Sequence, residues 1–254
     1  MKISRRGVLA GAAAGGGLAI AYVLLPQRFD APLAPAEGEV GFNAWLKIAT
    51  DGVVTVAVPQ CEMGQGVTTL IPQIVAMELG ADWRQIAVEP APPAGAYPNT
   101  ALASYWAELW LAGGADIASD PDSLLARRFA ERTRFTATAA GTTLAAYETP
   151  AREAAATARA MLIEEAAARW TIAPEQCQAA EGFVVAGAKR LRFAELAEGA
   201  AQRRQRAPPA SSTLSSFSRG WTRPKLNASG SNGCARATRA RFEDRAPSLL
   251  RTGR

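Results

Sequence analysis

The feature that most constrains this chain is a turn of two glycines around a glutamine, set between a β-rich run and an amphipathic helix. The turn consists of Gly64, Gln65 and Gly66, the β-rich run covers residues 53–58, and apolar side chains recur at helical spacing over 67–79. Two glycines let a backbone turn sharply and approach a bulky ligand closely. Because the unpaired N–H groups of a helix start point back at such a turn, we expect this junction to attract an anion.

The segments around the turn predict a β-hairpin, a helix and a strand, in that order. Residues 42–49 and 53–58 flank an Asp-Gly pair, and Asp-Gly between two β-rich runs indicates a hairpin. Gly80 is expected to end the helix, and residues 86–89 are expected to form a short strand. This part of the chain therefore combines both kinds of secondary structure within fifty residues.

The rest of the body predicts further helices and a second hairpin. The region after the strand is irregular and rich in Trp and Tyr, apart from a weak helix at 121–132. A Thr-Pro pair at 149–150 matches the preferred N-cap and first helical position, and predicts a long helix that ends near Trp170. A hairpin within 176–185 and a helix from Phe193 follow. The predicted fold class is α+β.

The side-chain inventory excludes several kinds of site. The chain contains no histidine, so catalytic triads and metal sites that need histidine are excluded. Its three cysteines, Cys61, Cys177 and Cys234, have no CxxC or paired spacing, which argues against a zinc site, an iron–sulfur cluster and a disulfide framework. We assign no metal ligand to this chain, and any cofactor must be held by backbone and uncharged side chains or by another chain.

The N-terminus predicts an export signal. Arg5 and Arg6 precede an uncharged stretch over 7–26 whose five glycines make it less apolar than a leucine-rich signal. This pattern indicates a twin-arginine (Tat) signal within 1–36, read by the Tat translocase, and hence a periplasmic protein. Because about 20 apolar residues can span a bilayer, an inner-membrane anchor is the alternative to cleavage. A Pro- and Ala-rich linker at 31–40 leads into the body.

The C-terminal segment differs in composition from the body. Residues 201–254 carry 12 basic and 2 acidic side chains and no Val, Ile, Met or Tyr, whereas residues 1–200 carry 16 basic and 21 acidic side chains. Such a segment buries too little apolar surface to fold alone, so we expect a disordered basic tail. Our preferred explanation is a frameshift near Ala200. A nucleic-acid-binding arm is the alternative, and export argues against it.

Several segments match one known family in order and spacing. They are residues 42–48, 58–60, 62–66, 78–83, 141–143, 151–154, 158–162 and 174–177. Together they resemble the large subunit of the molybdenum hydroxylases, the family of xanthine dehydrogenase and aldehyde oxidase. The resemblance is strongest to the branch that includes the isoquinoline 1-oxidoreductase beta subunit. It implies that residues 37–200 form a partial molybdopterin-binding domain.

The resemblance also implies a cofactor and the residues that contact it. In the family, the glutamine of the Gly-Gln-Gly turn hydrogen-bonds the metal face of a molybdenum–molybdopterin cofactor, in a dinucleotide form. Carried over, Gln65 has that role, and Gly64 and Gly66 permit close approach of the backbone. Thr142 and Thr143 occupy the loop that touches the pterin or the phosphates, although the family has a Gly-Gly-Ser-rich stretch there. A plain strand-to-helix loop is the alternative interpretation at these two threonines.

The implied activity belongs to an assembly larger than this chain. The family hydroxylates an aldehyde or N-heteroaromatic substrate with oxygen from water, and electrons leave through a separate [2Fe–2S] subunit or a cytochrome c. The family's large subunit is several hundred residues longer, and its base glutamate has no match here, so we assign no catalytic residue and expect a truncated, inactive chain. Two alternatives remain. One is a non-enzymatic exported α+β binding or scaffold domain, and the other, a DNA-binding protein, rests on the tail alone.

Overall fold

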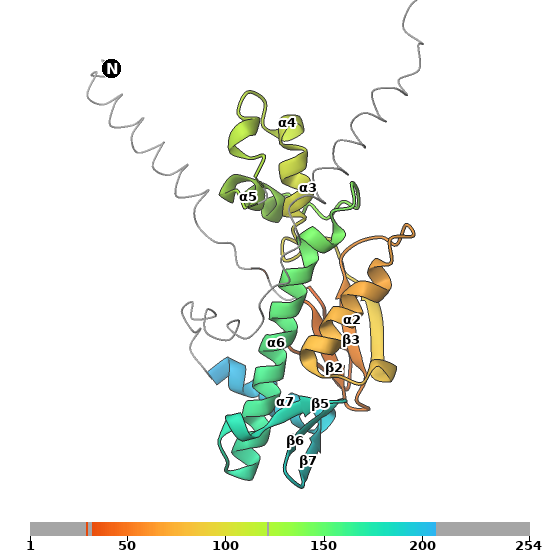
Figure 1. Cartoon of the computed structure of the whole chain (residues 1–254), viewed down its shortest axis with the longest axis vertical. Coiled ribbons are helices and arrows are strands. Elements are labelled where there is room, and N and C mark those ends of the chain that lie inside the picture. Colours follow the sequence, from red (N-terminus) through yellow and green to blue (C-terminus); the bar gives the residue numbers. More distant parts are fainter. Residues whose placement is uncertain (1–28, 30–31, 121, 207–254) are drawn as a thin grey trace, which may run out of the picture. The chain divides into compact units, whose positions relative to one another are not determined.

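The computed structural model describes residue 29, residues 32–120 and residues 122–206, all of which lie in one compact unit (Figure 1). Most of the predicted export signal, within 1–36, and nearly all of the predicted basic tail therefore lie outside the described residues. Within the described ranges, helices and strands mix as expected for an α+β fold. None of the helices in these ranges has the length and apolar character needed to cross a membrane.

A four-stranded sheet forms the first layer of the fold. Its strands are β1 (Glu39–Gly41), β2 (Leu46–Ala49), β3 (Val54–Val58) and β4 (Ile86–Pro90), in that spatial order. The β2–β3 pair is the predicted antiparallel hairpin, and β4 is the predicted strand, which pairs with β3 in parallel. The helix α2 (Val67–Leu79) makes the crossover between the two parallel strands, as parallel pairing requires.

Strand β1 was expected to be linker, and that expectation was wrong. Its backbone pairs with β2, and its Glu39 carboxylate meets the Lys47 ammonium at 2.8 Å. Lys47 is only 6% exposed and also lies 2.8 Å from Glu89 on β4. A buried ammonium needs such partners because an unpaired charge is costly to bury. Long-range pairing therefore makes this segment a strand, although its own composition does not.

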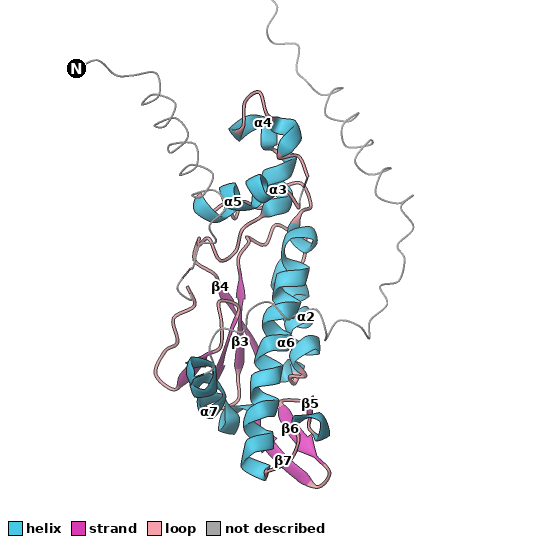
Figure 2. Cartoon of the chain, turned by 90° about the vertical axis from the view of Figure 1, so that its left-hand side faces the viewer, coloured by secondary structure: helices cyan, strands magenta, loops and turns pink. Residues whose placement is uncertain are grey.

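Helices α2 and α6 (Thr143–Trp170) lie side by side over this sheet and begin at the same end (Figures 1 and 2). α2 has the predicted bounds, and Gly80 ends it in a left-handed conformation. Small buried residues of α6, among them Ala151, Ala155 and Ala158, belong to the same core as Ile71 of α2. Small side chains allow two helix backbones to pack closely. The Gly-Gln-Gly turn therefore leads into a helix that is packed against α6 in the core.

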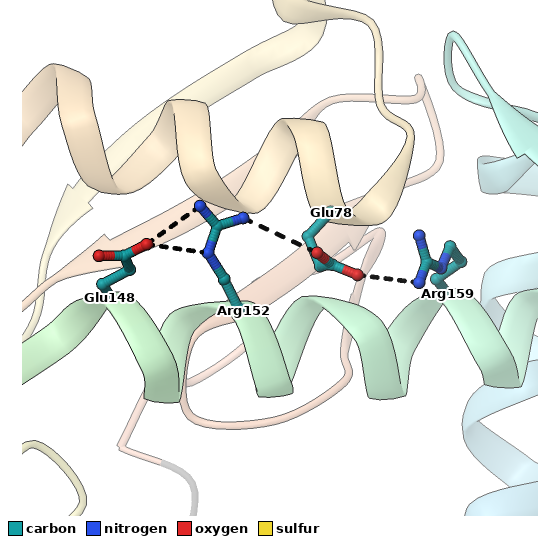
Figure 3. Close-up of polar contacts among 4 residues, drawn as sticks. All are labelled: Glu78, Glu148, Arg152 and Arg159. Carbon is teal, nitrogen blue, oxygen red and sulfur yellow. Dashed lines mark hydrogen bonds and ion pairs between the residues drawn. The ribbon is translucent and has the colours of Figure 1, made fainter. Parts of the chain in front are cut away.

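A chain of charges connects the two helices along their outer edge (Figure 3). Glu78 of α2 lies 2.8 Å from Arg159 and 3.9 Å from Arg152 of α6, and Arg152 lies 3.1 Å from Glu148. All four side chains are partly exposed, so each pair stabilises the fold by about 0.5 kcal/mol at most. Their arrangement favours one register of α2 along α6 more than it adds stability.

Helix α6 begins seven residues before the predicted start. The expectation that Thr149 caps the helix with Pro150 in its first turn was wrong, because Pro150 lies inside the helix. A proline within a helix removes one backbone hydrogen bond. Here the buried side chains of Ala146 and Tyr147 pack into the core and hold the extra turns in place. Burial thus outweighs the local cost of the proline.

The stretch expected to be irregular contains a small helical group (Figure 2). It comprises α3 (Thr100–Tyr105), α4 (Ala107–Trp110), η2 (Ala115–Ile117) and α5 (Leu124–Arg132), of which only α5 was predicted. The rings of Trp110 and Phe129 stack with centroids 4.1 Å apart, and the Trp110 indole donates to the Ala103 carbonyl at 2.7 Å. These contacts join helices too short to be recognised by periodicity.

A second sheet and a final helix close the described chain. The sheet consists of β5 (Gln178–Ala180), β6 (Phe183–Ala186) and β7 (Lys189–Arg192), so the predicted second hairpin has a third strand. Short 3-10 turns, η1 (Trp83–Gln85) and η3 (Pro174–Gln176), precede β4 and β5. Helix α7 (Phe193–Arg206) runs six residues past the expected boundary at 200. Its Arg203 pairs with the buried Glu165 of α6, which Arg169 also contacts at 2.8 Å.

Candidate functional site

The structure brings the two predicted cofactor-contacting segments together. Gln60, at the end of β3, donates from Nε2 to the Ala137 carbonyl at 3.1 Å and accepts at Oε1 from the Thr143 hydroxyl at 2.5 Å. The Cys61 N–H donates to the Thr138 hydroxyl at 3.1 Å. The residues that meet are 77 to 83 positions apart in sequence. The residues just before the Gly-Gln-Gly turn therefore contact the loop before α6 and the first residue of α6.

Asn99 holds this junction together through hydrogen bonds from a buried position. Its side chain is fully buried, donates to the Ala137 carbonyl at 2.9 Å and to the Thr142 hydroxyl at 3.0 Å, and accepts from the Leu102 N–H at 3.0 Å. The last bond caps α3. One amide thus connects the helical group to the loop before α6. Neither Gln60 nor Asn99 was singled out from the sequence, and the one available signal was an N-cap residue ahead of a short helix.

The turn itself is bonded by a nearby carboxylate. Glu62 accepts at Oε1 from the N–H groups of Gly64 and Gly66, at 2.8 and 2.9 Å, and at Oε2 from the Thr68 N–H and hydroxyl, at 3.1 and 3.0 Å. The N–H groups of Gly66 and Thr68 lower the pKa of this carboxyl to about 2. The expected anion seat at the start of α2 is therefore filled by the chain's own carboxylate.

The side-chain amide of Gln65 makes two hydrogen bonds within the loop. Its Oε1 accepts from the Met63 N–H at 2.6 Å, and its Nε2 donates to the Cys61 carbonyl at 2.8 Å. A primary amide has two N–H donors and two acceptor lone pairs. One N–H and one lone pair of Gln65 are left over by these two bonds, and the side chain is only half buried. The residue therefore retains the capacity to bond a ligand.

The two threonines use their hydroxyls within the protein. The Thr142 hydroxyl accepts from Asn99 and donates to the Ala139 carbonyl at 2.9 Å, while Thr143 is buried and donates to Gln60. Thr143 is also the first residue of α6 rather than part of a loop. Any contact that this segment makes with a ligand would come from its backbone. No side chain caps the first turn of α6, which begins beside the Gly-Gln-Gly turn.

The backbone of both segments has open space beside it. Gly64 and Gly141 have φ angles of +93° and +65°, which side-chain-bearing residues rarely adopt, and nothing lies within 4 Å of where a Cβ would stand on either. Among the described residues, no group of His, Cys, Asp or Glu is arranged to hold a metal ion. Cys61, which precedes the turn, is exposed. The site thus consists of backbone, one free amide edge and a satisfied carboxylate.

Comparison with known proteins relates this chain to cofactor-binding domains. Residues 8–109 match the family described as molybdopterin cofactor-binding domain. The chain is 30% identical over 187 residues to isoquinoline 1-oxidoreductase subunit beta of Brevundimonas diminuta, covering 73% of this chain and 20% of that protein. It is 25% identical over 162 residues to the membrane-bound pyrroloquinoline-quinone aldehyde dehydrogenase of Gluconacetobacter polyoxogenes, covering 64% of this chain and 16% of that protein. The matched part spans a fifth of these relatives or less.

A solved structure is similar over part of the chain. It is quinoline 2-oxidoreductase from Pseudomonas putida 86, which is 19% identical and covers 65% of this chain and 17% of its own, with a TM-score of 0.35.

Proposed function

This chain is related to the molybdenum-binding subunits of the molybdenum hydroxylases, and from that premise we propose that residues 60–66 and 139–145 form one wall of a molybdopterin site. The observation that carries the proposal is the junction of these two segments through Gln60 and Thr143. The Gly-Gln-Gly turn follows Gln60 directly after Cys61, Glu62 and Met63, so this contact connects the strand that leads into the turn to the first residue of α6. The bound cofactor would supply the two-electron oxidation chemistry.

The residues present fit such a group. A molybdopterin carries anionic and polar edges, and this wall offers a free amide N–H at Gln65 and the uncapped first turn of α6. Helix N-termini attract phosphates because their N–H groups are unpaired. We therefore assign Gln65, between Gly64 and Gly66, to the metal face, and the backbone at Thr142 and Thr143 to the pterin or to the phosphate of a dinucleotide form.

Cofactor content tests this assignment. The full chain is co-expressed with the cofactor biosynthetic machinery, and the purified protein is analysed for molybdenum and for fluorescent pterin. We expect both in the wild-type chain and a several-fold loss in Gln65→Ala. Gln73→Ala, at an exposed glutamine on α2, serves as the matched control and should retain both. A wild-type chain with neither molybdenum nor pterin would favour the binding or scaffold domain instead.

The activity of the whole protein is a further proposal. Relatives named for isoquinoline and aldehyde oxidation suggest an oxidoreductase that hydroxylates an N-heteroaromatic or aldehyde carbon with water as the oxygen source. Electrons would leave through a [2Fe–2S] subunit, with a cytochrome c as a second candidate acceptor. We expect no turnover from the 254 residues alone. Dye reduction by the isolated chain, with either substrate class, would contradict this.

We also propose that the protein is exported to the periplasm through Tat, on the basis of Arg5 and Arg6. The pair is recognised as a motif, so replacing both with lysine preserves the charge and should still block export. The measurement is the distribution of the protein between cytoplasm and periplasm in fractionated cells, with a known Tat substrate as the control. Normal export of the Lys-Lys variant would refute the proposal.

A further inference from the structure

One carboxylate organises the whole Gly-Gln-Gly turn. Glu62 is exposed at the surface, yet its two oxygens accept four hydrogen bonds from three residues of the turn and the first helical residues. The donors are the N–H groups of Gly64, Gly66 and Thr68 and the Thr68 hydroxyl. A charged acceptor forms stronger hydrogen bonds than a neutral one. Residues 61–66 contribute no buried side chain to the core, so the hydrogen bonds to this carboxylate determine the backbone conformation of the turn.

The helix start explains why the carboxylate comes from Glu62. The N-cap residue of α2 is Gly66, which has no side chain with which to cap the helix. Thr68 is the second helical residue, and its N–H is one of those left without a partner at a helix start. Glu62, four residues before the N-cap, supplies the missing acceptor and bonds Gly66 as well. A cap provided from this distance fixes the conformation of every residue between the two positions, including Gln65.

Gln65 has the geometry that such a constraint would produce. Its Oε1 bonds the Met63 N–H and its Nε2 bonds the Cys61 carbonyl, both within the same loop. These two bonds require the backbone between residues 61 and 66 to fold back toward the start of the loop. The same backbone N–H groups that bond Glu62 flank Gln65 on either side. The orientation of the Gln65 amide, and so of its free N–H, therefore depends on the backbone conformation that the hydrogen bonds to Glu62 hold in place.

We propose that Glu62 is a positioning residue for Gln65: its carboxylate holds the Gly64–Gly66 turn so that one N–H of the Gln65 amide stays free and directed outward, and it fills the start of α2 so that no other anion binds there. The first half of this statement deepens the proposed function, since it assigns the orientation of the residue that meets the cofactor. The second half follows from the four hydrogen bonds through which Glu62 already occupies this helix start.

The primary test needs no cofactor. In the isotope-labelled full chain, the side-chain amide signals of Gln65 are compared between wild type and Glu62→Gln. Glutamine has the same shape, but its NH₂ group takes the place of one carboxylate oxygen and cannot accept there, and its one oxygen is an uncharged and weaker acceptor. We expect the two Gln65 Nε2–H signals to move toward those of a free amide and exchange at Gly64 and Gly66 to become about 10-fold faster. The side-chain signals of Gln60, in the buried junction, should stay unchanged.

Two further variants separate positioning from general loss of structure. Glu62→Asp keeps the charge on a shorter side chain, and should restore part of the exchange protection at Gly64 and Gly66. Glu153→Gln, an exposed glutamate on α6, makes the same change of charge and should leave all of these signals unaltered. Gln65 signals that are identical in wild type and Glu62→Gln would overturn the proposal. Equal disturbance of Gln60 and Gln65 would overturn it too, because Glu62 would then act on the fold as a whole.

The anion-excluding role has its own measurement. Inorganic pyrophosphate is added to the wild-type chain and the amide signals of Gly64, Gly66 and Thr68 are followed. These signals should not move, whereas in Glu62→Gln they should shift as the helix start becomes available. Movement in the wild type at the same pyrophosphate concentration would refute the exclusion. Pterin content then reports on the proposed function separately: absence of pterin from the wild type refutes that function, and the amide signals still decide the role of Glu62.

Discussion

The two ends of α2 each carry a left-handed glycine, but their surroundings are opposite. At the C-terminal end, Gly80 has a φ of +77°, and a Cβ there would meet the Ala179 carbonyl oxygen at 2.5 Å. At the N-terminal end, Gly64 has a φ of +93° and nothing within 4 Å of the same position. Gly80 is required because the backbone of Ala179 lies where its side chain would stand. Gly64 has open space beside it, in the loop that we assign to the cofactor. The same residue type in a similar conformation thus permits close packing of two backbones at one end of α2 and access for a ligand at the other.

The largest effect should come from filling the closed end. Gly80→Ala adds a side chain in a strained conformation and pushes it into the β5 backbone, so we expect a loss of about 4 kcal/mol in the free energy of unfolding. Gly64→Ala incurs only the conformational strain, about 1 kcal/mol. Denaturant unfolding of both variants measures the difference. Equal losses at the two glycines would break the comparison between a packed and an open end.

The buried support under the open end should be nearly as sensitive. Asn99→Ala leaves the Leu102 N–H without its cap and removes both donors to Ala137 and Thr142. We expect a loss of about 3 kcal/mol, because buried polar groups without partners are costly. Asp82→Ala removes the cap of η1 at a partly exposed position and should cost about 1 kcal/mol. A smaller loss at Asn99 than at Asp82 would show that the junction does not depend on this side chain.

The contact that joins the two segments should have a measurable coupling. Gln60 and Thr143 share a 2.5 Å hydrogen bond between side chains that are 8% and 7% exposed. In a double-mutant cycle with Gln60→Leu and Thr143→Val, we expect the two losses to be less than additive by about 1 kcal/mol. The measurement is again denaturant unfolding of the wild type, both single variants and the double variant. Strictly additive losses would mean that the two segments are adjacent without being energetically linked.

The smallest effect is local and depends on pH. The pKa of Glu62 is lowered from 4.5 to about 2, so the folded turn favours the ionised carboxylate. The stabilisation of the turn is fully present above the ordinary pKa and is lost as the pH falls from about 4.5 to about 2. Protection of the Gly64 and Gly66 amides, relative to free peptide rates, should fall over that range before the Gln60 junction opens. Protection that stays constant between about pH 4.5 and about pH 2 would show that the carboxylate is not bonded as described.

The sequence was most informative where the interactions are local. Residues 53–58, 67–79 and 86–89 were predicted as strand, helix and strand, and the structure confirms them at β3, α2 and β4. The first strand has a β-rich composition, and the helix has helical periodicity and a terminal glycine, Gly80. The Gly-Gln-Gly turn belongs to the same class, since its bonds with Glu62 span six residues or fewer. A pattern of this kind can be recognised by reading along the chain.

Errors arose where distant contacts overrule local preference. β1 is a strand through its pairing with β2, α6 continues back through Pro150 because Ala146 and Tyr147 are buried, and α3 depends on the cap from Asn99. In each case the local composition favours linker, helix start or loop. Differences in intrinsic helix or strand propensity are about 1 kcal/mol per residue, and burial and long-range hydrogen bonding together contribute more than that. Proline inside a helix costs more, so several buried contacts are needed to offset it.

The sequence by itself determined the family relationship, the strand–turn–helix–strand unit and the chemical character of the site. These depend on residue types and short-range spacing, such as the two glycines and the glutamine of the turn, which can be read directly from the sequence. Only the tertiary structure decided that Gln60 reaches Thr143 across 83 positions and that Asn99 supports the same loop. That Glu62 occupies the helix start, where an external anion had been expected, is a local contact that the sequence pattern did not specify. The physical reason is that a hydrogen-bond partner is chosen by proximity in space, and the chain brings distant residues together only when the sheet, α2 and α6 pack into one core.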